Sequence, residues 1–186
     1  MADHYRTTAA ALKGKLLVAT PKLNRTMWEE SVILVAQHSE QMGADGYVIN
    51  RPSNTPINKL YQELDFYNAP DFPQLIRMGG PVRERNIAMI HSGEWYSAST
   101  QPITRSVSYS YDDFMLEKMA MMDTPYEYLM LAGMSQWAPG QLEREIKNGS
   151  WLVIDSNPAI VFANKPEKTW VNCLEIYSQT MFDEFF

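Results

Sequence analysis

The sequence predicts an α+β fold in one domain, and three observations support this. Short apolar runs bounded by turn residues occur in hairpin-sized clusters. Helical patterns are interspersed irregularly among these runs, without the regular strand–helix alternation of a doubly wound sheet. The chain has 186 residues, of which 45% are hydrophobic, and this is enough for one sizeable core.

The first half of the chain predicts strands joined by turns and one short helix. Apolar and β-branched runs predict strands at residues 15–19, 31–36, 47–49, 75–78 and 86–91. Gly43 and Gly46 bracket a predicted turn, so the second and third strands are expected to form a hairpin. Thr55 is an N-cap residue type followed by proline, which predicts a helix over 55–64 with Ile57, Leu60, Tyr61 and Leu64 on one face. Residues 65–74 then predict a loop.

The second half predicts three helices. Residues 104–109 alternate polar and apolar side chains, and Ser110 is predicted to cap a helix whose apolar stripe is Tyr111, Phe114, Met115, Met119 and Met122. A helix over 139–148, ended by Gly149, places Leu142 and Ile146 inward. Pro166 opens a last helix whose core stripe is Trp170, Cys173, Leu174 and Tyr177. Strands are predicted at residues 126–132, 151–154 and 159–162.

The charge disfavours nucleic-acid binding, and the cysteine content and hydropathy indicate the cellular compartment. The net charge is −6 and no dense basic run is present, so direct nucleic-acid binding is disfavoured. A single cysteine makes no internal disulfide, which favours a reducing compartment. There is no apolar run of about 18 residues and no secretion signal, so we expect a cytoplasmic protein without a membrane span. Residues 1–12 are expected to be a loosely ordered lead-in, and residues 13–186 a single domain.

Four separated segments carry a family resemblance. They are GKLLVATP at 14–21, GYVINRP at 46–52, GGPV at 79–82 and GQLEREI at 140–146. In this order they resemble the AlgH/YqgE family, also called UPF0301, and the match extends from about residue 13 to Trp170. One departure is Gln136, which stands where the family commonly has glycine before the tryptophan of its last signature.

The resemblance implies a mixed, largely antiparallel sheet that is curled into a pseudo-barrel with peripheral helices. The family's usual label is transcriptional regulator, from a proposed role in alginate production, and it comes without a described DNA-binding site. The resemblance therefore implies a fold and a regulatory role, and it assigns no catalytic residue.

The Gly79-Gly80-Pro81 segment has two interpretations. Glycines that expose backbone N–H groups, with Arg77, Arg83 and Arg85 nearby, would suit a small anion. The same residues suit a tight turn that needs positive φ. No Lys-Ser/Thr pair follows, as a phosphate-binding loop would require, and this favours the turn.

Candidate acids and bases are few. Glu143 and Glu145 are two residues apart, which separates them by about 200° on a helix and excludes a converging catalytic pair. His38 and His91 end predicted strands and would act as bases if a carboxylate oriented them, but bonding to loop carbonyls is the commoner role. No catalytic residue, metal site or cofactor is predicted, and Cys173 is expected to fill the core.

Two function hypotheses follow. The first is a non-enzymatic regulatory or protein-interaction domain that acts through a protein partner without direct DNA binding. The alternative is a small-molecule binding protein, for an anionic metabolite or nucleotide, or a cryptic enzyme, with its cleft near the Gly-Gly-Pro and Asn-Arg-Pro turns. Its candidate ligand-binding residues are Asn50, Arg51, Gly79, Gly80, Arg83, Trp137, Gln141 and Glu145. The oligomeric state stays open.

Overall fold

The computed structural model describes residues 12–185 of the chain. Within this range the strands are β1 (Lys15–Ala19), β2 (Val32–Ser39), β3 (Gly43–Val48), β4 (Pro52–Pro56), β5 (Leu75–Met78), β6 (Val82–Ser92), β7 (Gln101–Pro102), β8 (Val107–Ser110), β9 (Tyr128–Trp137) and β10 (Trp151–Asp155). The helices are α1 (Ile57–Glu63), α2 (Asp113–Ala120), α3 (Gln141–Lys147), α4 (Pro158–Val161) and α5 (Pro166–Phe185), with a 3-10 helix η2 (Pro21–Leu23).

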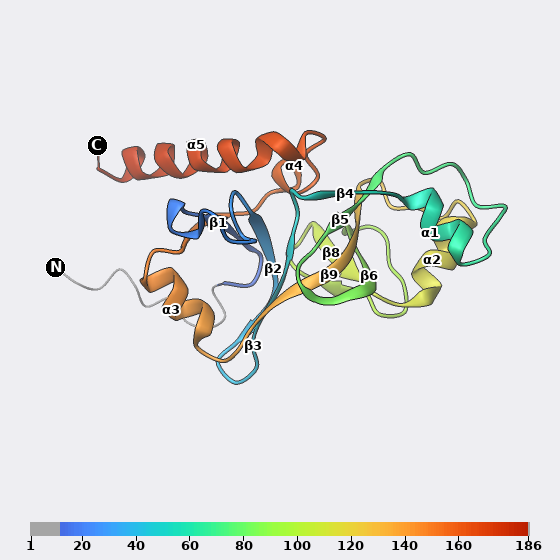
Figure 1. Ribbon diagram of the computed structural model, residues 1–186, viewed down its shortest axis with the longest axis horizontal. Coiled ribbons are helices and arrows are strands. Elements are labelled where there is room, and N and C mark those ends of the chain that lie inside the picture. The colour runs from blue at the N-terminus through green and yellow to red at the C-terminus, as the bar shows by residue number, and fades with distance from the viewer. Residues whose placement is uncertain (1–11, 186) are drawn as a thin grey trace.

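The strands form one curled sheet in the order β10-β1-β2-β3-β9-β6-β8-β7, and β4 and β5 branch from it. All the strand pairs that the structure describes are antiparallel except β5 with β9. Helices lie outside this sheet: α5 and α3 cover opposite faces of its β1–β3 part, and α1 and α2 lie together at the far end (Figure 1). The predicted α+β fold with a pseudo-barrel sheet is therefore confirmed.

Strand β9 joins the two halves of the sheet. Its last residues, 135–137, pair with β3, while residues 128–132 and Met134 pair with β6. On the edge of β9 opposite β6, Leu131 and Ala132 pair with β5 in parallel. The strand therefore takes part in both halves, and side chains carried by β3, β6 and β9 are brought close together.

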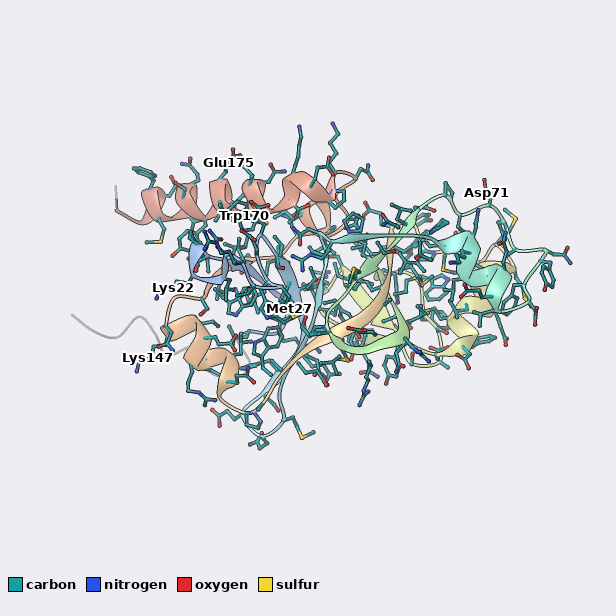
Figure 2. The ribbon with its side chains drawn as sticks, viewed as in Figure 1. Lys22, Met27, Asp71, Lys147, Trp170 and Glu175 are labelled. Carbon is teal, nitrogen blue, oxygen red and sulfur yellow. The ribbon has the colours of Figure 1, made fainter. Side chains whose placement is uncertain are left out.

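Within the described part of the chain, three clusters of buried side chains make up the core. The central cluster includes β1, β2 and β3 side chains together with Cys173 of α5. Trp170 lies on the side of α5 that faces the sheet, opposite Glu175 (Figure 2), and its indole N–H donates to the Ala19 carbonyl at 2.9 Å. A second cluster packs α3 through Leu142, and a third packs α1 and α2 at the far end of the sheet.

Most predicted elements are confirmed. The strands at 15–19 and 75–78, the β2–β3 hairpin, α1, α3 and the long α5 all form, and Gly149 ends α3 with φ 75°. The predicted strands at 31–36, 86–91 and 126–132 largely coincide with the longer β2, β6 and β9. The hairpin turn falls earlier than expected, because Gly43 and Gly46 both lie within β3. A Cβ on Gly46 would approach the Leu34 carbonyl oxygen to 2.9 Å, so close strand packing explains this glycine.

Three predicted details are wrong, two of them because a residue not predicted as a cap begins a helix and the third because the predicted cap residue belongs to a strand. Residues 159–162 were expected in a strand, but Pro158 begins α4 and the Asn157 side chain accepts from the Ile160 N–H at 3.0 Å. Helix α2 is capped by Asp112 and not by Ser110. Of the predicted stripe, Tyr111, Phe114 and Met122 are exposed, and Met115 and Met119 face the core together with Leu116. Thr55 and Pro56 belong to β4, and α1 has no side-chain cap.

The expected lead-in falls almost wholly on residues 1–11, which lie outside the described residues, whereas Leu12 is described and buried. Among residues 12–185, none of the helices has the length and apolarity that crossing a membrane requires.

Candidate functional site

Asn50 and Arg51 hold the loop that precedes β2. The Asn50 side chain accepts from the Val32 N–H and donates to the Glu30 carbonyl, both at 2.8 Å. Arg51 donates to the Met27 carbonyl, to the Glu29 carbonyl at 2.9 Å and to Ser31 Oγ at 3.0 Å. These two side chains thus satisfy backbone groups of a loop in which Glu30 has a left-handed φ of 55°. A ligand role for them stays a prediction.

Gly79 and Gly80 lie where the β5–β6 turn crosses β9. A Cβ on Gly79 would approach the Gly133 carbonyl oxygen to 2.4 Å, and a Cβ on Gly80 would approach the Met134 carbonyl oxygen to 2.3 Å. Gly80 has φ 150°, but Gly79 needs glycine for its space and not for its φ. The Gly79 N–H donates to Ala132 and its carbonyl accepts from Val48, so the backbone groups of Gly79 are bonded within the sheet.

A hydrogen-bond network at α3 joins Trp137, Gln141 and Glu145. The Glu145 carboxylate accepts from the indole N–H of Trp137 at 2.9 Å, from the indole N–H of Trp151 at 2.8 Å and from the Gln141 amide at 2.8 Å. Gln141 also accepts from the Ala138 N–H at 3.0 Å, which closes the turn into α3. These bonds attach α3 to β9 and β10, and binding of a ligand there stays a prediction.

The structure brings some of these residues together and separates others. The Asn-Arg-Pro and Gly-Gly-Pro turns are adjacent, because the Met78 N–H donates to the Arg51 carbonyl at 2.8 Å. Trp137 pairs with Ala44 in β3 and packs in the α3 cluster, whereas Tyr47 points to the opposite face of β3 and packs in the central cluster. Trp137 and its partners therefore lie across the sheet from Arg83, which is on the Tyr47 side.

The two candidate histidines, His38 and His91, have bonding partners inside the protein. His38 Nε2 lies 2.7 Å from Glu143 Oε1, and the His38 side chain is only 1% exposed. His91 is fully buried, with Nδ1 2.9 Å from the Ser92 carbonyl and Nε2 2.9 Å from Ser110 Oγ. A carbonyl only accepts, so Nδ1 carries the proton and Nε2 accepts from Ser110. Burial lowers the pKa of His91, and the neutral ring fits this arrangement.

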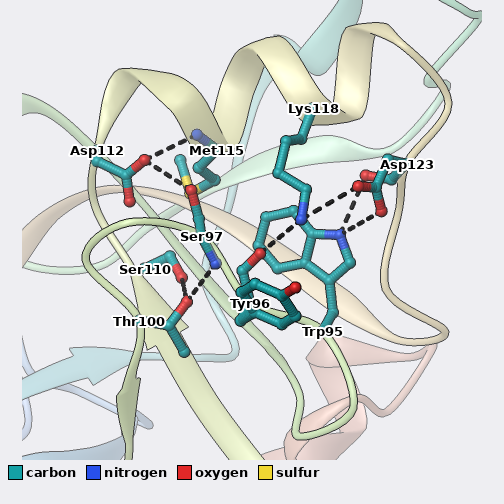
Figure 3. Close-up of polar contacts among 9 residues, drawn as sticks. All are labelled: Trp95, Tyr96, Ser97, Thr100, Ser110, Asp112, Met115, Lys118 and Asp123. Atoms are coloured by element: carbon teal, nitrogen blue, oxygen red, sulfur yellow. Dashed lines mark hydrogen bonds and ion pairs between the residues drawn. The ribbon is translucent and has the colours of Figure 1, made fainter.

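Ser110 continues into a polar cluster at the start of α2 (Figure 3). Thr100 Oγ1 lies 2.6 Å from Ser110 Oγ and accepts from the Ser97 N–H at 2.6 Å. Asp112 accepts from Ser97 Oγ at 2.6 Å and from the Met115 N–H at 2.9 Å. Ser110 is itself fully buried, so this serine–histidine pair orders the core and offers no accessible nucleophile.

Arg83 lies on an open cleft that the sequence analysis did not anticipate. The cleft has a volume of about 250 Å³ and is lined by polar and aromatic side chains that include Gln37, Asp45, Tyr47, Arg83, Tyr109 and Tyr111. The Tyr109 and Tyr111 rings are stacked with centroids 5.9 Å apart. Burial raises the pKa of the Tyr47 hydroxyl, and Tyr109 and Asp45 raise it further, so this hydroxyl stays protonated at neutral pH.

Comparison with known proteins agrees with this architecture. A family model described as AlgH-like matches residues 16–181. The chain belongs to the AlgH-like family. UPF0301 protein GOX1459 of Gluconobacter oxydans is 34% identical over 88% of this chain and 89% of its own length. UPF0301 protein MCA0413 1 of Methylococcus capsulatus is 32% identical over 89% of this chain and 91% of its own length.

Two solved structures extend the comparison. The solution structure of the AlgH protein from Pseudomonas aeruginosa has a TM-score of 0.76 and 28% identity, covering 93% of this chain and 90% of that one. The crystal structure of protein DIP2367 from Corynebacterium diphtheriae has a TM-score of 0.70 and 23% identity, covering 87% and 85%, and supports the fold alone. The resemblance drawn from the sequence motifs is confirmed.

Two of the four AlgH-like segments lie at the cleft, but their sequences did not predict that a cleft is there. Tyr47 lies in the segment at 46–52 and Arg83 directly follows the segment at 79–82. Gln37, Asp45 and Tyr109 come from other parts of the chain, and Tyr111 was assigned to a core stripe. The sequence signal for the cleft was a tyrosine, Tyr47, close to the polar residue Asp45 in a predicted strand region. Such a pattern is also typical of ordinary sheet surfaces.

Proposed function

We propose that this AlgH-like protein is a non-enzymatic regulatory domain that acts by binding a protein partner. The observation that carries the proposal is a group of exposed apolar side chains on and beside α2, which we call the α2 face. Its residues and their exposed fractions are Tyr96 (73%), Phe114 (53%), Met121 (80%), Met122 (76%) and Tyr126 (88%).

These side chains share one region of the surface. Phe114, Lys118 and Met121 recur at helical spacing, so they lie on the same side of α2. Lys118 Nζ lies 4.7 Å from the Tyr96 ring centroid and donates to the Tyr96 carbonyl, which places Tyr96 beside the helix. The Tyr126 N–H donates to Glu94 at 2.9 Å, two residues before Tyr96. Exposed aromatic and methionine side chains that gather in this way are typical of protein interfaces.

The charges around the α2 face indicate which partner it suits. Its exposed charged side chains include Glu94, Asp113, Glu117, Asp123 and Glu127. The cation of Lys118 is largely buried between Trp95 and Tyr96 and pairs with Asp123 at 3.1 Å. The rim is therefore acidic, and the partner that complements it is a segment with apolar side chains flanked by lysine or arginine.

A peptide titration tests the proposal. A synthetic amphipathic helix of lysine and leucine is expected to bind the protein, and a glutamate–leucine version is not. The Phe114→Ser/Met121→Ser variant should weaken binding at least about tenfold, which is about 1.4 kcal/mol. The matched control is Val171→Ser/Ile176→Ser, which removes exposed apolar side chains from α5. Equal affinity of the two double variants would contradict the proposal.

A photo-crosslinking experiment tests for a native partner. A photoreactive amino acid at position 114 is expected to capture one defined protein in cells, and the same residue at exposed position 172 of α5 is not. The captured protein should present a basic, apolar segment, and Met121→Ser should reduce its yield. The same products from both positions would argue against a partner at α2.

The cytoplasm is the compartment that we propose for this interaction. The single cysteine, Cys173, is buried and forms no disulfide within the chain. The alternative function, binding of a phosphorylated metabolite or nucleotide near the Gly-Gly-Pro turn, stays a prediction. Screening such compounds for a concentration-dependent rise in melting temperature tests it.

A further inference from the structure

The cleft that contains Arg83 is bounded by two β-bulges. In β2 the register shifts between Val35 and Gln37, so that two residues oppose one on β3. In β6 the register shifts between Val82 and Ile87, while their partners on β9, Met134 and Ala132, are only two residues apart. Both bulges contribute side chains to the lining, Gln37 from β2 and Arg83 and Asn86 from β6. Bulges at such positions redirect side chains toward a site.

Arg83 is held on the cleft by a conformation that costs free energy. Its φ is 51°, in the left-handed region that residues with a Cβ seldom adopt. The close crossing of Gly133 beneath the bulge, where a Cβ would lie 3.2 Å from Glu84 Cα, permits this path. The Arg83 side chain is exposed, and among the side chains described, those of residues 12–183, no carboxylate oxygen lies within ion-pair distance of its guanidinium. It is therefore a cation available to an anionic group.

The charges along the cleft are balanced. Arg83 is the cation among the lining residues that the structure describes, and Asp45 is the carboxylate. Asp45 is oriented by the amide of Gln136, which donates to it at 3.0 Å. The other polar side chains in the lining are amides and tyrosine hydroxyls. A ligand with one negative and one positive group suits this lining, whereas a phosphate dianion would meet one cation together with a repelling carboxylate.

An aromatic platform lies at one wall. Tyr109 is buried and its hydroxyl accepts from Gln37 at 2.5 Å, which fixes the ring. Tyr111 stacks on Tyr109 at an interplanar angle of 26° and is 56% exposed. An exposed ring backed by a fixed one suits stacking with a planar ligand group.

We propose that this cleft is a binding site for a small zwitterionic aromatic molecule of the aromatic α-amino-acid class. Arg83 binds its carboxylate, Asp45 binds its ammonium group and Tyr111 stacks on its ring. A guanidinium donates two parallel hydrogen bonds to a carboxylate, and the Asp45 carboxylate accepts from the ammonium group. This site shares no residue with the α2 face, so it stands or falls independently of the proposed partner binding.

The first experiment uses L-tryptophan as the probe and follows binding by calorimetry and by backbone amide NMR shifts. We expect a dissociation constant of about millimolar or tighter, with the shifts concentrated at residues 37, 45, 83 and 111. Tryptamine lacks the carboxylate, indole-3-propionate lacks the ammonium group and L-leucine lacks the ring. Each should bind at least about tenfold more weakly than L-tryptophan.

The second experiment uses matched variants. Arg83→Met should weaken L-tryptophan binding at least about tenfold. The affinity for tryptamine should stay the same, because tryptamine has no carboxylate for Arg83 to bind. The control is Arg85→Met, on the same exposed bulge but outside the cleft lining. Tyr111→Ala should weaken binding of L-tryptophan more than binding of L-leucine. Tyr67→Ala, which changes an exposed tyrosine outside both the cleft and the α2 face, should change neither.

Three results would overturn the proposal. One is no binding of L-tryptophan up to its solubility limit, and another is equal affinity of Arg83→Met and Arg85→Met for it. The third is adenosine monophosphate binding more tightly than L-tryptophan with shifts at the same residues, because a balanced lining does not favour a phosphate. Circular dichroism of each variant separates loss of the site from loss of the fold.

Discussion

At the scale of single residues, several side chains that the sequence suggested as ligand groups form hydrogen bonds within the protein, to backbone groups or to other side chains. Asn50 bonds the Val32 N–H and the Glu30 carbonyl, and Glu145 accepts from two indole N–H groups. Buried polar groups without partners would each cost about 1–3 kcal/mol, so selection for the fold alone accounts for such residues.

The Gly80 position gives a first prediction. Gly80→Ala should destabilise the protein by about 2 kcal/mol or more, because the new Cβ would lie 2.3 Å from the Met134 carbonyl oxygen at φ 150°. Gly93→Ala is the control, since its Cβ would come no closer than 3.3 Å to a neighbouring atom. Urea unfolding measures both free energies. A Gly80→Ala variant as stable as Gly93→Ala would show that the turn relaxes freely.

Cys173 gives a second prediction at this scale. The thiol is fully buried and burial raises its pKa to about 11, so it is neither reactive nor exposed. Cys173→Ala should therefore cost only about 1 kcal/mol, as for loss of a small buried apolar group, and leave partner and ligand binding unchanged. Thermal denaturation and the peptide titration measure the two effects. Loss of binding in a folded variant would assign the thiol a function.

At the scale of elements, Asp112 shows how one carboxylate organises a helix start. Burial alone would raise its pKa, but hydrogen bonds from Ser97, Ser99 and the Met115 N–H outweigh burial and hold the pKa at about 2, below its ordinary value of 3.8. The charged form therefore stabilises the fold above pH about 4, and this contribution is lost as the pH falls through about 2.

This linkage gives the third prediction. Asp112→Asn keeps a capping side chain but removes the charge, and it should cost about 1 kcal/mol at neutral pH after allowance for solvent screening. The difference from the parent should shrink as the pH falls from about 4 toward 2. Asp113→Asn, one position along on the exposed side, is the control and should show a smaller change. A cost independent of pH would mean that the charge is not responsible.

Elements also show what the sequence can and cannot reveal. Strand-length apolar runs and the stripe through Trp170 and Cys173 predicted β1 and α5 correctly, because burial on one face imposes the pattern. The run at 159–162 was misread because it is too short to distinguish a strand from a helical turn, and the Asn157-Pro158 cap decided it. The cleft was missed since it depends on two bulges, and register shifts leave no periodic trace in the sequence.

At the scale of the whole molecule, the negative net charge leads to the fourth prediction. With a net charge of −6, the purified protein should not be retained by duplex DNA at physiological ionic strength. A fluorescence anisotropy titration with labelled duplex at several salt concentrations tests this, and a known basic DNA-binding domain serves as the positive control. Salt-dependent, sequence-selective binding of duplex DNA by the protein alone would contradict this prediction and would favour regulation by direct DNA binding.

The position of β9 also has a consequence for synthesis on the ribosome. Its residues, 128–137, emerge after β1–β8, yet they pair with β3, β5 and β6. Until then the nascent chain exposes unpaired strand edges on both halves of the sheet, which invite pairing with other chains. We therefore expect the nascent chain to be most prone to mispairing while the segment that follows β8 is translated.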